Sequence, residues 1–202
     1  MRAMIESDAH YVDRDFSDLQ LPQIELTHAS FHGCTFTDCS FAEGALRFCR
    51  FVDCRFVRCD LSLCAITGTN FGSARFEESR LVGIDWTRAD WQKALLAKPP
   101  SFTSCNLSHG TFIGLELQRA VLRDCLAHNV DFRDADLSRG DLSGTDLDQG
   151  LFANTNLSGA DLRRARNYDI APEQNTLKGA RFALPEALAL LYSMDIELDE
   201  SS

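Results

Sequence analysis

Residues 31–64 read FHGCT FTDCS FAEGA LRFCR FVDCR FVRCD LSLC, and this stretch decides the fold. Each group of five begins with phenylalanine or leucine, and its fourth residue is cysteine in every group but one, where Gly44 stands. The sequence therefore repeats with a period of five residues, and a fixed short period is the signature of a repeat architecture.

The large apolar position extends far beyond this stretch. Every fifth residue from Phe16 to Leu96 is large and apolar. After a slip of one residue the series resumes at Phe102 and continues to Leu162, with Ala127 as its only small member. The position two residues earlier is mostly small, and all eight cysteines of the chain fall on it. The large apolar residues and the small residues both recur every five positions, which strongly indicates a repeat of five residues.

A period of five is incompatible with one helix or one straight strand. An α-helix turns about 100° per residue, so residues five apart spread around its surface. A strand alternates faces, so an odd spacing sends successive residues to opposite sides. The pattern therefore predicts short extended sides ended by corners, with the apolar residue and the small residue two before it both pointing inward. Four sides close a coil of about twenty residues, and about seven and a half coils stacked about 4.8 Å apart form a solenoid about 36 Å long.

The phase of the repeat divides the chain into five expected segments. These are an N-terminal cap over residues 1–14, a first stack over 15–96, a phase-breaking loop over 97–101, a second stack over 102–166, and a C-terminal cap and dimerisation segment over 167–202. Pro99 and Pro100 offer no backbone donors to stacked strands, so we expect the loop to kink the rod or offset the two stacks.

The C-terminal segment has a different pattern. Residues 183–194 predict a short helix with Pro185 at its first position, and residues 196–198 alternate like a final strand. Leu184, Leu188, Leu191 and Met194 form an apolar stripe on this helix. Two interpretations stay open: a plain cap on the last coil, or a cap whose second apolar face pairs two subunits.

Composition narrows the class of partner. The chain is 45% hydrophobic and 25% charged, and neither a membrane span nor the apolar core of a signal peptide is present, so we expect a cytoplasmic protein without membrane contact. The net charge of −10 disfavours nucleic acid as a partner and fits a basic surface. Half of this charge lies in residues 167–202, where seven acids face only Lys178 and Arg181.

No constellation predicts catalysis or a cofactor. The cysteines are spaced by five and never as the C-x2-C pairs of zinc sites, so we interpret them as reduced, buried fillers. The histidines are scattered, and no metal site is expected. β-Helix lyases and acyltransferase solenoids use longer or six-residue repeats, so strict fives argue against an enzyme.

Acidic residues recur before four successive apolar positions. They are Asp131, Asp136, Asp141 and Asp146, with Asp134 and Asp148 nearby. One interpretation is that they bond backbone groups at the corners, and the other is an electronegative stripe that binds a partner; both can hold. We interpret Arg47, Arg50, Arg55 and Arg58 as a solvated basic patch that balances nearby acids.

The motifs Asp60-Leu61-Ser62, Asn106-Leu107-Ser108 and Asp136-Leu137-Ser138 resemble the A-[DN]-L-x-x consensus of the pentapeptide-repeat family. The resemblance covers residues 16–166. It implies an all-β fold, a right-handed quadrilateral β-helix, here followed by a short C-terminal helix.

The whole chain also resembles the subgroup that protects bacterial type II topoisomerases, which includes the albicidin-resistance, microcin B17 self-protection and quinolone-resistance proteins. The residues that carry this likeness are 31–59, 81–86 with Trp91, 112–115, Asn167-Tyr168 and 178–198. The likeness implies a homodimer formed by the C-terminus, in which the interface residues are Phe182, Leu184, Leu188, Leu191, Tyr192, Met194, Ile196 and Leu198. The chain lacks the long projecting loops of the quinolone-resistance members.

The resemblance further implies a non-enzymatic DNA mimic that binds DNA gyrase and confers resistance to a topoisomerase poison, without cofactor or metal. The alternative is an interaction scaffold with an unrelated protein partner. The expected partner-binding residues are Asp131, Asp134, Asp136, Asp141, Asp146, Asp148, Lys98, Pro99 and Pro100.

Overall fold

The computed structural model describes residues 5–91 and 98–198. The strands are β1 (His10–Val12), β2 (Asp15–Ser17), β3 (Glu25–Thr27), β4 (Ser30–His32), β5 (Thr35–Thr37), β6 (Ala45–Arg47), β7 (Arg50–Val52), β8 (Arg55–Val57), β9 (Arg75–Glu77), β10 (Ser101–Thr103) and β11 (Val121–Arg123). The helices are the 3-10 turns η1 (Trp86–Arg88) and η3 (Glu186–Leu188) and the α-helix α1 (Ala189–Tyr192).

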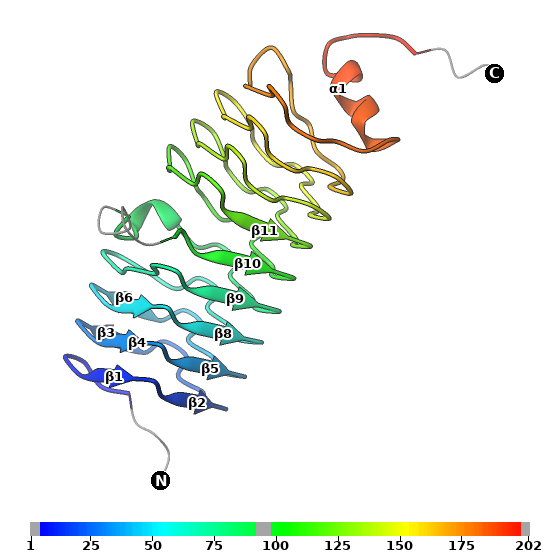
Figure 1. The fold of residues 1–202 in the computed structure, drawn as a ribbon. Coiled ribbons are helices and arrows are strands. Elements are labelled where there is room, and N and C mark those ends of the chain that lie inside the picture. Colours follow the sequence, from blue (N-terminus) through cyan, green and yellow to red (C-terminus); the bar gives the residue numbers. More distant parts are fainter. Residues whose placement is uncertain (1–4, 92–97, 199–202) are drawn as a thin grey trace.

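The strands stack as parallel ladders in a rod with the N-terminus at one end and α1 at the other (Figure 1). Each residue pairs with the one twenty positions later, as Phe16 does with Phe36 and Phe36 with Phe56. One side of the coil forms the sheet β11-β10-β9-β8-β5-β2, and two further sides form β1-β4-β7 and β3-β6. The fourth side is a ladder of isolated bridges such as Ser40 to Asp60. The predicted solenoid, with twenty-residue coils of four sides, is confirmed.

Phenylalanine rings fill the tube in columns. The rings of Phe16, Phe36, Phe56 and Phe76 stack nearly parallel, with centroids 5.0, 4.8 and 4.7 Å apart. Rings on adjacent sides meet edge to face, as Phe31 and Phe36 do at 5.4 Å. Both geometries suit the quadrupole of an aromatic ring, so stacking adds to the free energy of burial. The inward direction predicted for the large apolar position is confirmed.

The small position two residues earlier also faces the core. All eight cysteines are free and buried, which confirms their interpretation as reduced fillers. Burial raises the pKa of the Cys54 thiol to about 12, so this thiol stays protonated at neutral pH. Where a hydroxyl takes the position, it bonds across coils: Thr69 Oγ1 donates to the Leu46 carbonyl at 2.6 Å and accepts from the Cys49 N–H at 3.2 Å.

Two local devices turn each corner. The residue two positions after each inward-facing large apolar residue adopts a left-handed conformation, as at Asp18 with φ 55° and Asp134 with φ 59°. Asp and Asn tolerate this region better than most residues. The residue just before the large apolar residue fixes the turn, since Asp60 Oδ1 accepts a hydrogen bond from the backbone N–H of Ser62 at 2.9 Å. The structure thus confirms that consensus Asp and Asn bond backbone groups at the corners.

The loop differs from the prediction. Across the loop, the separation in sequence between paired residues of adjacent coils changes from twenty to twenty-six, as Arg75 pairs with Ser101 and Arg80 with Asn106. The sheet that contains β9 and β10 runs on without interruption, so the expected division into two stacks at residues 97–101 is wrong. The six extra residues fall between η1 and β10 along the chain. Leu96, placed on the ladder by the sequence, lies outside the described residues.

The solenoid is also longer than predicted at both ends. His10 already pairs with Ser30, so residues 1–14 are not a separate cap. At the other end Thr176 pairs with Asn156 and Arg181 with Asp161, beyond the boundary predicted at residue 166. The predicted helix is confined to η3 and α1, and the strand predicted at 196–198 is absent, because these residues pair with no neighbouring coil.

The phenylalanine columns predict the effect of two matched substitutions. Phe36→Ala should lower the free energy of unfolding by about 3–5 kcal/mol, because it leaves a cavity in a dry, stacked column. Phe48→Ala removes the same ring from a position that is 53% exposed and should change it by less than about 1 kcal/mol. Urea unfolding followed by circular dichroism measures both, and equal losses would contradict the inward assignment.

Candidate partner-binding surface

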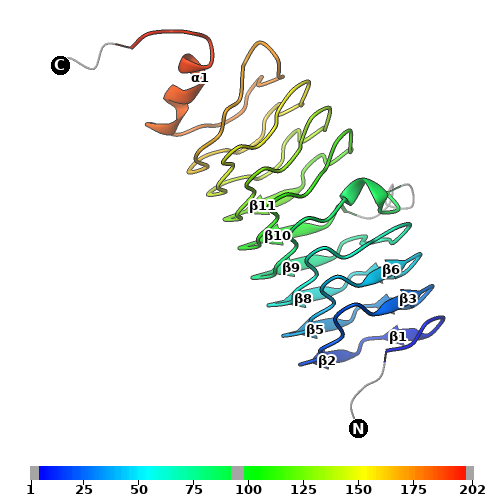
Figure 2. The same ribbon diagram turned by 180° about the vertical axis from the view of Figure 1, so that it is seen from behind.

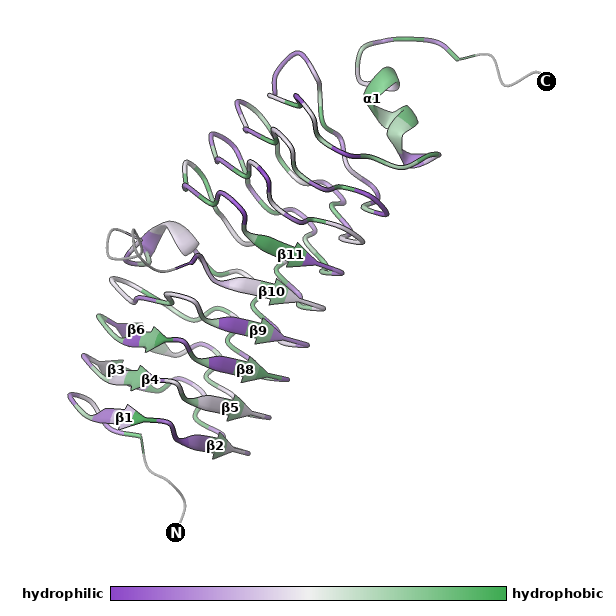
Figure 3. Cartoon of the chain, viewed as in Figure 1, coloured by the Kyte–Doolittle hydropathy of each residue, from purple (hydrophilic) through white to green (hydrophobic). Residues whose placement is uncertain are grey.

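The last coil carries an apolar segment that the solenoid covers on only one side. Phe182 packs on Tyr168 with ring centroids 5.7 Å apart, and Leu190 packs against the core. Leu184, in contrast, is 76% exposed, and Tyr192 is half exposed. Figure 3 shows the region of α1 as hydrophobic at the free end of the rod. Such apolar exposure marks a surface suited to protein contact.

The predicted interface residues divide into two groups. Leu184, Tyr192, Met194 and Ile196 are exposed, whereas Phe182, Leu188, Leu191 and Leu198 are half-buried. The predicted stripe assumed a regular helix over 183–194. The chain instead forms two short turns, so exposure does not follow helical spacing.

The four aspartates expected to form a stripe lie on four different sides of the coil. Asp131 pairs with Leu151, Asp136 with Asn156, Asp141 with Asp161, and Asp146 with Arg166. Residues five apart occupy successive sides, so the acids encircle the rod. The expectation of one electronegative stripe is therefore wrong.

These aspartates are also engaged locally. Asp131, Asp136, Asp141 and Asp146 each accept the backbone N–H two residues later. Hydrogen bonds from the Arg133 guanidinium hold the pKa of the Asp131 carboxyl below its ordinary value. Arg123 pairs with Asp141, and Arg166 Nε lies 3.1 Å from Asp146 Oδ2. Each carboxylate thus fixes a corner, and those of Asp131, Asp141 and Asp146 are also paired with arginine.

The other predicted partner-binding residues lie apart from one another. Asp134 is exposed at a corner, where it accepts the Asn154 amide at 3.2 Å. Asp148 is half-buried and accepts a hydrogen bond from the side-chain amide of Gln149. At the loop, Lys98 is exposed and its carbonyl accepts the Ser73 N–H at 2.8 Å, while Pro100 is buried and Pro99 half-buried.

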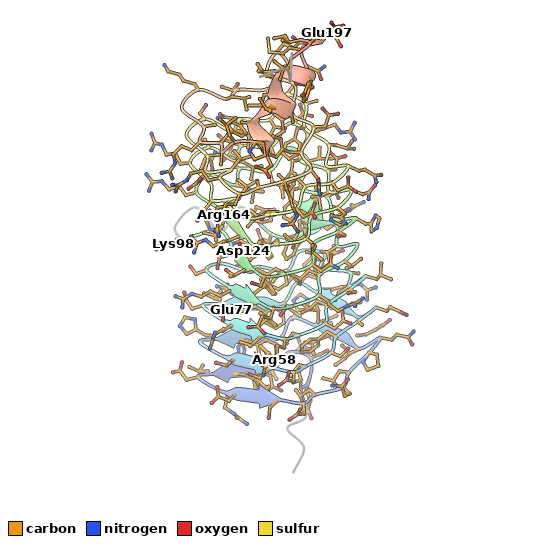
Figure 4. The ribbon with its side chains drawn as sticks, turned by 90° about the vertical axis from the view of Figure 1, so that its right-hand side faces the viewer. Arg58, Glu77, Lys98, Asp124, Arg164 and Glu197 are labelled. Carbon is orange, nitrogen blue, oxygen red and sulfur yellow. The ribbon has the colours of Figure 1, made fainter. Side chains whose placement is uncertain are left out.

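Charges on the face of the six-stranded sheet balance across coils. Arg58 donates to Asp38 through two hydrogen bonds of 2.8 Å, and Arg55 pairs with Glu77. Figure 4 shows Arg58, Glu77, Asp124 and Arg164 along this side of the rod. Three of the four arginines in the predicted basic patch form ion pairs, which supports its interpretation as a balancing face.

One acidic site escaped the sequence analysis. Asp161 is nearly buried and binds two arginines, Arg163 at 2.7 Å and Arg181 at 2.9 Å. Hydrogen bonds from Arg163 lower the pKa of the Asp161 carboxyl to about 2. Asp161 and Arg181 are twenty residues apart, and this spacing could have predicted their ion pair. The prediction would have required the repeat to continue past residue 166.

Within residues 5–91 and 98–198, no group of three or more His, Cys, Asp or Glu side chains is placed to hold a metal ion. No helix in these same ranges has the length and apolarity needed to cross a bilayer.

Comparison with known proteins agrees with the geometry. A family model described as pentapeptide repeat region matches residues 29–98, and one described as pentapeptide repeats (8 copies) matches 101–139, 116–152 and 141–166. No curated protein matches the chain in sequence.

Two solved structures are similar in fold. A trypsin-treated form of QnrB1, a plasmid-mediated fluoroquinolone resistance protein, has a TM-score of 0.71 and 18% identity, over 96% of this chain and 99% of that one. HetL, a pentapeptide repeat protein involved in heterocyst differentiation regulation from the cyanobacterium Nostoc sp., has a TM-score of 0.58 and 20% identity, over 86% and 85%.

Four-sided coils, inward columns at every fifth residue and fixed corners define a repeat protein of the quadrilateral β-helix class. The matching models together cover most of the chain and have the same period. The chain belongs to the pentapeptide-repeat family.

Asp161 predicts an acid-dependent loss of stability. Its folded pKa of about 2 lies below the ordinary value of 3.8, so its contribution is complete above about pH 4 and is lost as the pH falls through 2. Asp161→Asn should remove about 1 kcal/mol of the fall in unfolding free energy between pH 6 and pH 3. Unfolding free energies of both proteins at pH 6 and pH 3 provide the test, and an equally steep fall in the variant would refute it.

Proposed function

We propose that this protein is a non-enzymatic DNA mimic that acts in the cytoplasm, binds bacterial DNA gyrase as a homodimer, and protects the enzyme from a topoisomerase poison. The observation that carries the proposal is the exposed apolar segment at the C-terminal end of a rod. The similarity to QnrB1 over nearly the whole of both chains supports it, because that protein confers fluoroquinolone resistance.

The dimensions of the rod support the proposal. The ladder that runs from Asp15 to Arg181 has eight steps. At about 4.8 Å per step it spans about 38 Å. Two copies joined end to end would therefore extend about 80 Å, close to the length of about 23 base pairs of duplex. A two-fold rod of this length matches a two-fold enzyme that binds DNA.

The charge distribution supports the same arrangement. Five acids of the C-terminal segment are exposed, namely Asp169, Glu173, Glu186, Asp195 and Glu197. In an end-to-end dimer they would gather around the two-fold axis, at the centre of the rod. Acidity concentrated there would favour a basic DNA-binding surface by electrostatic steering.

The second candidate is an interaction scaffold with an unrelated protein partner. HetL favours it, because that protein has the same repeat and is involved in the regulation of differentiation. The two candidates differ in whether gyrase is the target.

The dimer predicts a mass of twice 22.5 kDa by light scattering. Leu184→Arg combined with Met194→Arg should give a folded monomer, because both side chains are exposed and each arginine would have to bury a charged group in an apolar contact. Leu63→Arg is the matched control, since Leu63 is as exposed but lies on the flank of the rod, and it should remain a dimer. A wild-type monomer would defeat the proposed assembly.

The gyrase proposal predicts that the dimer restores DNA supercoiling by purified gyrase in the presence of a poison. A fluoroquinolone and albicidin should be tested separately while the protein is titrated. The monomeric double variant should lose at least tenfold in potency, whereas Leu63→Arg should act as the wild type does. A dimer that leaves supercoiling unchanged with both poisons would favour the scaffold instead.

A further inference from the structure

A groove of about 960 Å³ runs along the N-terminal half of the rod. Its floor is the ladder in which His10 pairs with Ser30, Ser30 with Arg50 and Arg50 with Asn70. Corner residues, Phe48 among them, form one wall, and Val52 lies on the other. This ladder begins in β1, at the opposite end of the rod from α1 (Figure 2).

The floor of the groove carries an arginine although the chain is acidic. His10, His28, His32 and Arg50 line it, and Asp90 at one end is the only carboxylate among the described lining residues. Within the described part of the chain, no carboxylate lies within ion-pairing distance of Arg50. The other three arginines of the same patch are paired with acids. The guanidinium of Arg50 is thus available to form an ion pair with an acidic group of a bound molecule.

One wall is built at a conformational cost. Phe48 sits at a corner with φ 54°, a region that bulky side chains rarely adopt, and its ring is half exposed. The ring stacks on His28 at 5.4 Å. On its other side is Gly68, where a Cβ atom would lie 2.4 Å from the ring. The left-handed φ is the regular corner conformation of this fold, so what distinguishes Phe48 is the exposed aromatic ring that it places at that corner.

An aromatic residue also closes the far end. Trp91 lies where the six-residue insertion leaves the coil, and its indole N–H donates to the Trp86 carbonyl at 2.7 Å. This bond fixes the ring, which is half-buried, at the end of the groove. The groove therefore offers the Arg50 guanidinium between two aromatic side chains, and this combination suits a ligand that carries a carboxylate and apolar side chains.

We propose that this groove docks an extended acidic segment of a partner protein. The four ladder steps from His10 to Asp90 span about 19 Å, the length of about six extended residues. A carboxylate of the segment meets the Arg50 guanidinium, and its apolar side chains meet Phe48 and Trp91. Nucleic acid is disfavoured, because a chain of net charge −10 repels a polyanion at long range. The proposal is independent of gyrase.

The test uses the full chain and two fluorescein-labelled hexapeptides, Glu-Leu-Glu-Leu-Glu-Leu and Lys-Leu-Lys-Leu-Lys-Leu, in anisotropy titrations. The acidic peptide should bind at least tenfold more tightly than the basic one. Arg50→Glu should weaken its binding at least tenfold, and Phe48→Ala at least threefold. Both residues are exposed, so circular dichroism should report an intact fold.

Arg75→Glu is the matched control. Arg75 occupies the same position of the repeat as Arg50 and is exposed, but it lies in β9 on another side of the coil. This variant should bind the acidic peptide within twofold of the wild type. Equal binding of both peptides, equal losses in the Arg50 and Arg75 variants, or a preference for a six-nucleotide oligothymidylate would each overturn the proposal.

Discussion

Parallel backbone pairing at a separation of twenty residues is the constraint on which the rest of the structure depends. It places every side chain directly on its counterpart in the next coil. In the core this favours residues that stack on their own kind, which is why Phe16, Phe36, Phe56 and Phe76 form one continuous column. It equally explains the small position, because a residue there must fit beside another small side chain one coil away, as Thr69 does beside Cys49, while its hydroxyl donates to a carbonyl of the coil below.

The same constraint governs charge on the surface. Like charges twenty residues apart would repel at close range, whereas opposite charges attract. The chain uses this at Asp38 with Arg58, Asp146 with Arg166 and Asp161 with Arg181, each pair exactly one coil apart in register. Acids five apart, by contrast, are distributed around the rod. A sequence that seems to carry an acidic stripe can therefore present a nearly balanced face, and its uncompensated charge collects where no further coil follows.

The sequence predicted the core and failed at the interruptions, for a definable reason. Side-chain class repeats with period five, so the inward positions follow directly from residues such as Phe36 and Cys39. The insertion before Ser101 is six residues long, which is one repeat of five plus one residue. The added repeat leaves the five-residue period unchanged, so the sequence pattern reveals only the one residue that shifts its phase. Past residue 166, Tyr168 and Ile170 break the spacing, yet backbone pairing needs no particular side chain and resumes at Thr176. Ion pairs that join residues twenty apart, such as Asp161 with Arg181, could have been found from the repeat, whereas a pair such as Arg123 with Asp141 depends on side-chain conformation.

Both proposed binding surfaces follow from the stacking rule itself. A solenoid satisfies most of its surface internally, because each exposed group has a counterpart one coil away. Binding sites should then arise where that counterpart is missing. Leu184 is covered by no coil within residues 5–91 and 98–198, which leaves an apolar surface that a second copy would bury. In the groove, Arg50 has Ser30 on one side and Asn70 on the other, and neither can neutralise it. The first site calls for apolar contact and the second for a carboxylate, so one rod can hold two chemically distinct partners without either site disturbing the ladder between them.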